Sequence, residues 1–189
     1  MKETFSTDFT RRGVLAAFAA FAVTAAPSYS RASGIIRNSG DVRRLSMYSR
    51  RTGESINTIY WVDGKYIPEA LNEINRLMRD WRQNEVKKID IRTIDIMAAA
   101  HVMMDTKEPY QLLSGYRSAK TNALLRRSSR RVASKSLHIS GQAADLRLTS
   151  RSVRKLSRAA LSCKSGGVGT YSRSGFVHMD CGPIRSWGR

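Results

Sequence analysis

The chain has 189 residues, of which 41% are hydrophobic and 25% are charged, so it is long enough for one domain with a sizeable core. Its formal net charge of +18 predicts attraction to an anionic partner. The basic residues are scattered and match no nucleic-acid-binding signature, so we expect no nucleic-acid partner.

Residues 1–33 have the character of an export signal. Arg11 and Arg12 directly precede an apolar run, residues 14–26, which small residues follow. This order is typical of a secretory signal, and the adjacent arginines favour the twin-arginine variety. The run is shorter than the ~20 apolar residues that a membrane span needs. We therefore predict a periplasmic domain over residues 34–189, with peripheral membrane contact only through an uncleaved signal.

The first half of this domain is predicted to contain three strands and then two helices. Asp63-Gly64 is a strong hairpin signal, and Pro68 is well placed for the first turn of a helix. His101 lies in the second helix without a carboxylate at ligand spacing other than Asp105, so we expect it to be a packed or surface residue. Alternation and helical spacing predict strands over 45–48, 56–62 and 65–67 and helices over 68–81 and 92–104.

The second half is predicted to alternate strands with helices. Ser118 is a candidate cap for the helix that follows the turn 114–118. We predict strands over 110–113, 145–148, 166–171 and 175–180 and helices over 119–127 and 150–162. No internal repeat or second domain is evident. The expected fold is a single α+β domain in which an antiparallel sheet carries a metal site and helices flank it.

Cys163 and Cys181 are the only cysteines of the chain. An oxidising compartment permits a disulfide between them. The sequence cannot give the distance between their Cα atoms, so both the bridged and the free forms stay open.

Two imidazoles and one carboxylate, from His138, Asp145 and His178, form a ligand set that zinc accepts at catalytic sites, with water in the fourth position. Gly141 permits a tight turn after the first histidine. The alternative is that these are ordinary polar residues at strand ends. Asp180 falls on the same face of its strand as His178, so it would either orient that imidazole or act as the general base.

Several segments carry a resemblance to a known family. The run Ser136-x-His138-x-x-Gly141-x-Ala143-x-Asp145 resembles the first metal-binding motif of the D-alanyl-D-alanine carboxypeptidase/VanX-like zinc metallopeptidases. The fuller resemblance, over almost the whole predicted domain, is to the YcbK-like murein endopeptidases. It includes Arg44–Ser46, Arg51–Glu54, Tyr60–Tyr66, Arg79–Arg82, Ser114–Ser118, Gly166–Tyr171 and Phe176–Asp180.

The resemblance implies a zinc-dependent peptidase that hydrolyses peptide cross-links of peptidoglycan. The zinc ligands would be His138, Asp145 and His178. Arg117 would bind or polarise the substrate near the scissile carbonyl. The alternative role for Arg117 is that of a charge that caps a turn or lies at the sheet edge. The related enzymes place a catalytic carboxylate three residues before the last histidine, but this chain has Gly175 there. Asp180 is therefore the candidate general base.

Two alternatives to an endopeptidase stay open. A D,D-carboxypeptidase that trims stem-peptide ends would use the same metal site. A non-catalytic basic module that binds the cell wall is favoured by the missing upstream carboxylate and by the positive charge. The alternative explanation of that charge is a solvated basic surface.

Overall fold

The structure is a computed structural model that describes residues 42–129 and 132–188. The predicted signal, residues 1–33, lies outside the described residues. Within the described ranges, no helix is both long and apolar enough to cross a membrane.

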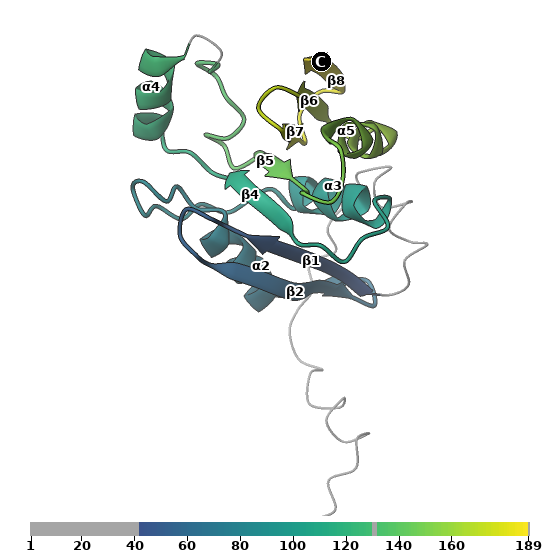
Figure 1. The fold of residues 1–189 in the computed structure, drawn as a ribbon. Coiled ribbons are helices and arrows are strands. Elements are labelled where there is room, and N and C mark those ends of the chain that lie inside the picture. Colours follow the sequence, from purple (N-terminus) through teal and green to yellow (C-terminus); the bar gives the residue numbers. More distant parts are fainter. Residues whose placement is uncertain (1–41, 130–131, 189) are drawn as a thin grey trace, which may run out of the picture.

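One eight-stranded sheet and four helices make up the described chain (Figure 1). The strands are β1 (Val42–Tyr48), β2 (Ser55–Val62), β3 (Lys65–Tyr66), β4 (Tyr110–Ser114), β5 (Ala143–Arg147), β6 (Gly167–Tyr171), β7 (Phe176–Asp180) and β8 (Arg185–Gly188). The helices are α2 (Pro68–Leu77), α3 (Ile91–Val102), α4 (Ala119–Ser128) and α5 (Val153–Ser162). The α+β class is confirmed.

The sheet is mixed, so the prediction of an antiparallel sheet holds only for some of its strand pairs, among them those that join β4, β5, β7 and β6. Its strand order is β3-β2-β1-β4-β5-β7-β6-β8. The pairs β1–β4 and β6–β8 are parallel, and the other pairs are antiparallel. Both parallel pairs join strands that are not consecutive in the sequence, which local alternation of apolar residues cannot reveal.

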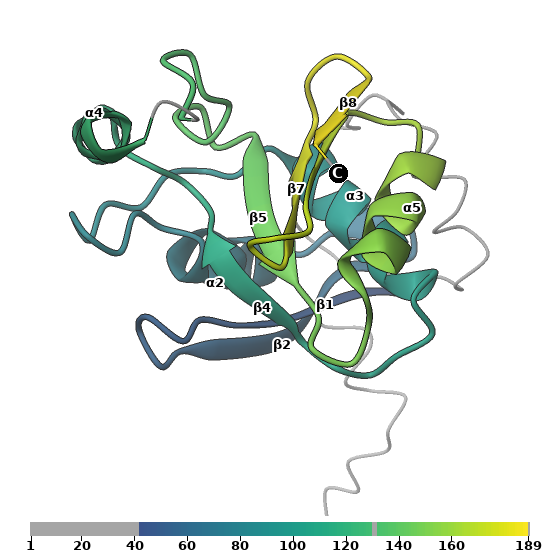
Figure 2. The ribbon, with the colours of Figure 1, turned by 45° about the horizontal axis from the view of Figure 1, so that its top comes forward.

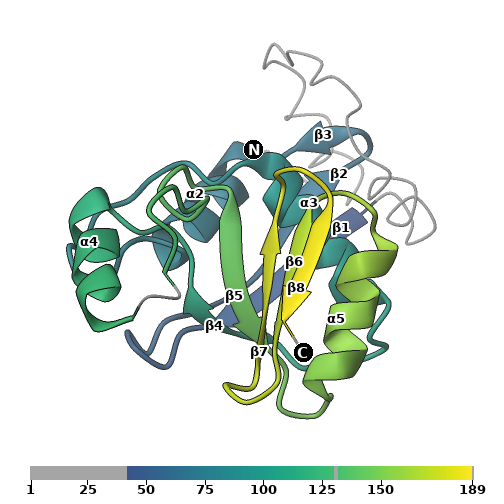
Figure 3. The ribbon, with the colours of Figure 1, turned by 90° about the horizontal axis from the view of Figure 1, so that it is seen from above.

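The helices begin where capping side chains satisfy the first free N–H groups. Ser118 caps α4 by accepting a hydrogen bond from Thr121 N at 3.1 Å, as predicted, and Ser152 caps α5. Helices α3 and α5 pack on each other and on β7, whereas α4 and α5 stand at opposite ends of the molecule (Figures 2 and 3). The core therefore lies between the sheet and α2, α3 and α5.

Both cysteines are free thiols in buried positions. Cys163 directly follows α5, and Cys181 directly follows β7. Burial raises the pKa of the Cys163 thiol to about 11, which makes the thiol unreactive at neutral pH. Of the two forms that the sequence left open, the structure has the free one.

A buried carboxylate on α3 joins the first hairpin to the helix layer. Asp95 accepts hydrogen bonds from Arg43 Nη1 at 3.0 Å, Tyr60 Oη at 2.9 Å and Tyr66 Oη at 2.8 Å. We expect Tyr60→Phe to lower the free energy of unfolding by about 2 kcal/mol, because it removes a hydrogen bond to a buried charge. Tyr66→Phe should lower the free energy of unfolding by less, because Tyr66 is half-buried and water can replace its hydroxyl as a hydrogen-bond donor to Asp95. Urea denaturation of both variants measures this difference, and equal losses would contradict it.

Candidate metal centre

The candidate site is a row of residues that crosses the sheet. Asp145 on β5 is the direct partner of His178 on β7, and Ser114 on β4 is the partner of Asp145. His178 in turn pairs with Gly169 on β6. Cross-strand partners have side chains on the same face, so the antiparallel part of the sheet brings the carboxylate and the imidazole together.

The structure brings together the three side chains that the sequence proposed as ligands. His138 Nε2 lies 3.2 Å from His178 Nδ1 and 3.3 Å from Asp145 Oδ1, and His178 Nδ1 lies 2.9 Å from Asp145 Oδ1. All three residues are buried. Among the described residues, this is the one group of three or more such side chains whose donor atoms could hold a metal ion together.

The outer nitrogen of each imidazole has a hydrogen-bond acceptor. His138 Nδ1 lies 2.6 Å from the Gly115 carbonyl oxygen, and His178 Nε2 lies 3.0 Å from Asp180 Oδ2. An N–H directed at these acceptors leaves His138 Nε2 and His178 Nδ1 as the atoms that face the cluster. This is the arrangement in which imidazoles usually bind metals.

Burial and neighbouring charges shift the pKa values of the cluster. Burial lowers the pKa of His138, so this ring is neutral at pH 7. Burial would also lower the pKa of His178, but hydrogen bonds to Asp145 and Asp180 raise it to about 9. Burial would raise the pKa of Asp145, but the two histidines hold it well below its usual value. A proton on His178 therefore balances the carboxylates, and a bound cation would displace that proton.

Arg117 lies at the edge of the cluster. Its Nη2 donates to Asp145 Oδ2 at 2.5 Å and lies 3.2 Å from His138 Nε2. Its Nε donates to Ser114 Oγ at 2.8 Å. The side chain is 13% exposed, so its guanidinium is fixed close to the candidate ligands and can still meet a bound molecule.

The turn that carries Arg117 also holds His138 in place. Gly115 provides the acceptor for His138 Nδ1–H, and Arg117 N donates to the His138 carbonyl at 3.1 Å. A Cβ on Gly115 would lie 2.4 Å from the Met78 carbonyl oxygen, so only glycine permits this close approach. The loop of His138 has a second such point at Gly141, where φ is +71° and a Cβ would lie 2.6 Å from the Lys88 carbonyl oxygen.

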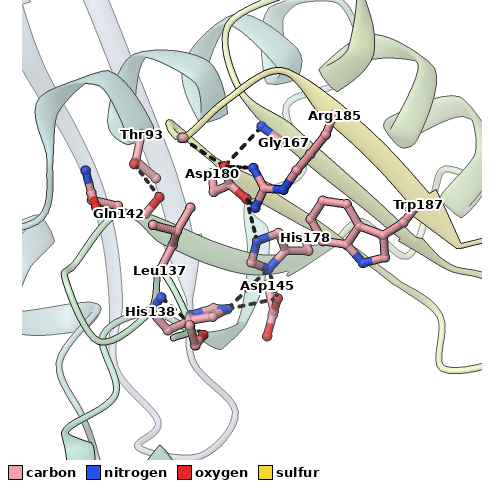
Figure 4. Close-up of polar contacts among 12 residues, drawn as sticks. Thr93, Leu137, His138, Gln142, Asp145, Gly167, His178, Asp180, Arg185 and Trp187 are labelled. Carbon is pink, nitrogen blue, oxygen red and sulfur yellow. Dashed lines mark hydrogen bonds and ion pairs between the residues drawn. The ribbon is translucent and has the colours of Figure 1, made fainter. Parts of the chain in front are cut away.

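Asp180 lies behind His178 and away from the other candidate ligands (Figure 4). Its Oδ2 contacts His178 Nε2 at 3.0 Å and Arg185 Nη2 at 2.7 Å. Its Oδ1 accepts from Gly167 N, Gly182 N and Arg185 Nη1. The residue is 0% exposed. Burial would raise its pKa, but hydrogen bonds to His178 and Arg185 lower it to about 2.

Strand β8 was not predicted, and it contributes two side chains to this region. Arg185 pairs with Asp180, and the Trp187 ring lies 5.3 Å from the His178 ring (Figure 4). A Cβ on Gly167 would lie 2.5 Å from Arg185 Nη1, and one on Gly169 would lie 2.6 Å from the indole. Glycines at both positions therefore let the β8 side chains reach across β6 to β7. The two glycines at alternate positions of β6, Gly167 and Gly169, were the sequence signal from which a covering strand could have been predicted.

Two other residues lie where the sequence suggested. Within the part of the chain that the structure describes, His101 belongs to no possible metal-binding group. Its Nε2 contacts the Glu108 carbonyl at 2.7 Å and its ring packs on Tyr110. Gly175 has a φ of +70° in the turn between β6 and β7, and it provides no carboxylate there.

Comparison with known proteins decides the family. Residues 37–187 match the family described as peptidoglycan L,D-endopeptidase MepK. The chain belongs to this family. Over 145 residues it is 43% identical to peptidoglycan L,D-endopeptidase MepK of Escherichia coli K12, an alignment that covers 77% of this chain and 80% of the relative. Over 146 residues it is 36% identical to the probable peptidoglycan L,D-endopeptidase MepK of Haemophilus influenzae, covering 77% of this chain and 78% of the relative.

The family confirms the resemblance to murein endopeptidases that the motifs indicated. The matched range contains every residue of the candidate site, from Arg117 to Trp187. It leaves residues 1–36 outside, so the family match says nothing about the predicted signal.

Proposed function

We propose that this chain is a zinc-dependent endopeptidase that hydrolyses peptide cross-links of peptidoglycan at an L,D bond. The printed names of the two relatives support the substrate and the bond. The observation that carries the metal assignment is the convergence of His138 Nε2, His178 Nδ1 and Asp145 Oδ1 within 2.9–3.3 Å of one another.

These distances fit zinc. Ligand atoms about 2.0–2.2 Å from a tetrahedral ion lie roughly 3.3–3.6 Å from each other. The 3.2 and 3.3 Å spacings of this cluster are close to that range, and the 2.9 Å spacing of His178 Nδ1 and Asp145 Oδ1 would widen by about half an ångström around an ion. Two imidazoles and a carboxylate are also a donor set known from catalytic zinc sites. When bound, zinc would polarise the scissile carbonyl and make a water molecule more acidic.

Arg117 is the proposed substrate-binding cation of the site. Its guanidinium is held by Ser114 and by Asp145, so it is already oriented before substrate binds. A fixed positive charge beside the scissile carbonyl would stabilise the negative charge that develops on the oxygen. Arg117 contacts Asp145 through Oδ2, whereas Oδ1, the proposed ligand atom, faces the two histidines.

The contacts of Asp180 favour the orienting role over the general-base role. Both of its oxygens are engaged, and the residue is fully buried, so it has no free lone pair directed at the substrate side. Its hydrogen bond to His178 Nε2 fixes the tautomer that directs Nδ1 at the metal.

We expect Asp180→Asn to weaken zinc binding by about 10–100-fold, because it removes the charge that orients and polarises His178. Competition with a chromophoric chelator measures this affinity. Glu73→Gln, an exposed change on α2, is the matched control and should bind zinc normally. Unchanged affinity in Asp180→Asn, together with lost turnover, would instead support the general-base role.

Digestion of purified cross-linked muropeptides tests the proposed function. Dimers joined through an L,D bond should be converted to monomers, and a chelator should abolish this conversion until zinc is restored. Mass analysis distinguishes the alternatives, because a carboxypeptidase would shorten stem peptides and leave the dimers intact. Intact dimers and unshortened stems with zinc-loaded protein would refute both enzymatic assignments and leave the wall-binding module.

We also propose that the protein acts in the periplasm after twin-arginine export. The adjacent Arg11 and Arg12 before the apolar run support this route. Replacing both arginines with lysine should keep the protein in the cytoplasm, as cell fractionation would show. Normal export of that variant would contradict the twin-arginine route and would favour general secretion.

A further inference from the structure

Two guanidinium groups flank an exposed aromatic ring near Arg117. The Cζ atom of Arg82 lies 4.2 Å from the centroid of the Trp81 ring, and that of Arg51 lies 5.7 Å from it. Both distances are within the range of cation–π attraction. Trp81 is 36% exposed, and both arginines are exposed. The ring therefore holds two positive charges at the surface and leaves them accessible.

Asp80 attaches this cluster to the turn of Arg117. Its Oδ1 accepts from Arg82 N at 3.1 Å, and its Oδ2 accepts from Ser118 N at 2.9 Å. One buried carboxylate thus fixes the backbone beside Trp81 and the backbone beside Arg117. The turn that carries Arg51 is tied to the same region by the ion pair of Glu54 with Arg79 at 2.7 Å.

The guanidinium groups of Arg51 and Arg82 form no ion pair with a side chain of the described residues, although the carboxylate of Asp80 lies near Arg82. Among the ion pairs of the described residues, none includes Arg51 or Arg82. The pKa of Arg82 is lowered, first by partial burial and then by the charges of Arg51 and Arg117, although Asp80 opposes this effect. The guanidinium of Arg82 therefore lies close enough to those of Arg51 and Arg117 to be repelled by both, and a bound anion would relieve that repulsion.

We propose that Arg51, Trp81 and Arg82 form a carboxylate-binding subsite beside the metal centre. Its ligand is a free carboxylate of the peptidoglycan peptide, so the proposal rests on the proposed function. A planar guanidinium matches a carboxylate with two parallel hydrogen bonds, and Trp81 pre-orients the groups that make them. With Arg117 at the scissile carbonyl, a second anchor fixes the register of the peptide relative to the metal centre.

Paired substrates test the subsite. We would compare a cross-linked muropeptide dimer that has free stem carboxylates with the same dimer in which those carboxylates are amidated. The native enzyme should have a KM for the acid about tenfold below that for the amide, since a charged hydrogen-bonded pair contributes about one power of ten. Arg82→Ala should raise the KM for the dimer with free carboxylates about tenfold and leave the kcat for that dimer unchanged. Its kinetics with the amidated dimer should stay as in the native enzyme. Arg82→Lys should give an intermediate KM.

Arg158→Ala is the matched control. Arg158 is exposed on α5, which packs on α3, β6 and β7 and contributes no residue to the subsite, so its loss lowers the net charge equally without removing a subsite group. Equal kinetics on the two dimers by the native enzyme, or equal losses on both dimers in Arg82→Ala, would overturn the subsite. A native enzyme that cleaves neither dimer would overturn the proposed function, and the subsite with it.

Discussion

Replacing His178 with alanine should lower zinc affinity by roughly 10²–10³-fold and abolish muropeptide cleavage at limiting zinc. Four-ligand zinc sites have apparent binding free energies of about 10–16 kcal/mol, which is roughly 2.5–4 kcal/mol per ligand. His178 is also the partner of both Asp145 and Asp180, so its removal leaves two buried carboxylates without their shared imidazole. Competition with a chromophoric chelator gives the affinity, and mass analysis of the digest gives the activity.

His101→Gln is the control for this experiment. His101 is the one histidine outside the cluster, and its Nε2 contacts a main-chain carbonyl that a glutamine amide can also reach. Thermal unfolding of the metal-free proteins should be measured in parallel, because zinc stabilises only variants that bind it. If His178→Ala kept native zinc affinity and activity, His178 would not be a ligand and the metal would have to lie elsewhere.

Local sequence signals were sufficient for most elements of the fold. The Asp63-Gly64 turn, the proline at the start of α2 and the Ser118 cap of α4 all act within a few residues, and the structure contains each of them. The helix predicted over 68–81 ends earlier, at Leu77. In place of a last helical turn, Asp80 accepts a hydrogen bond from Ser118 N, a partner 38 residues away that helical spacing cannot show.

The inner part of the candidate site was predictable, and its surroundings were not. The three proposed ligands could be recognised from their residue types and from their spacing within two sequence motifs. They are His138, Asp145 and His178. Strand β8 has only four residues, and its pairing with β6 depends on the folded chain. The sequence therefore left two roles open for Asp180, and the contact with Arg185 that favours the orienting role depends on that strand.

Replacing Arg117 with alanine should lower kcat/KM for cross-linked dimers by about 10²–10³-fold at saturating zinc. This is the usual effect of removing one group that stabilises a developing oxyanion. Arg117→Lys should recover part of the loss, because lysine restores the charge but not the fork that spans Ser114 and Asp145. Steady-state kinetics and zinc content, measured on the same preparations, separate loss of catalysis from loss of metal.

Arg92→Ala provides a matched control. It also breaks an arginine–aspartate ion pair, but its partner is Asp90 and the pair lies at the surface, outside the candidate metal centre. It should leave kcat/KM unchanged, because exposed ion pairs contribute little. Arg117 could stabilise the transition state or only position Asp145, and these two roles predict different combinations of zinc content and turnover in Arg117→Ala. If it stabilises the transition state, Arg117→Ala stays zinc-loaded and inactive. If it only positions Asp145, Arg117→Ala binds zinc weakly, and added zinc restores its turnover. Restoration by zinc would thus contradict the proposed catalytic role.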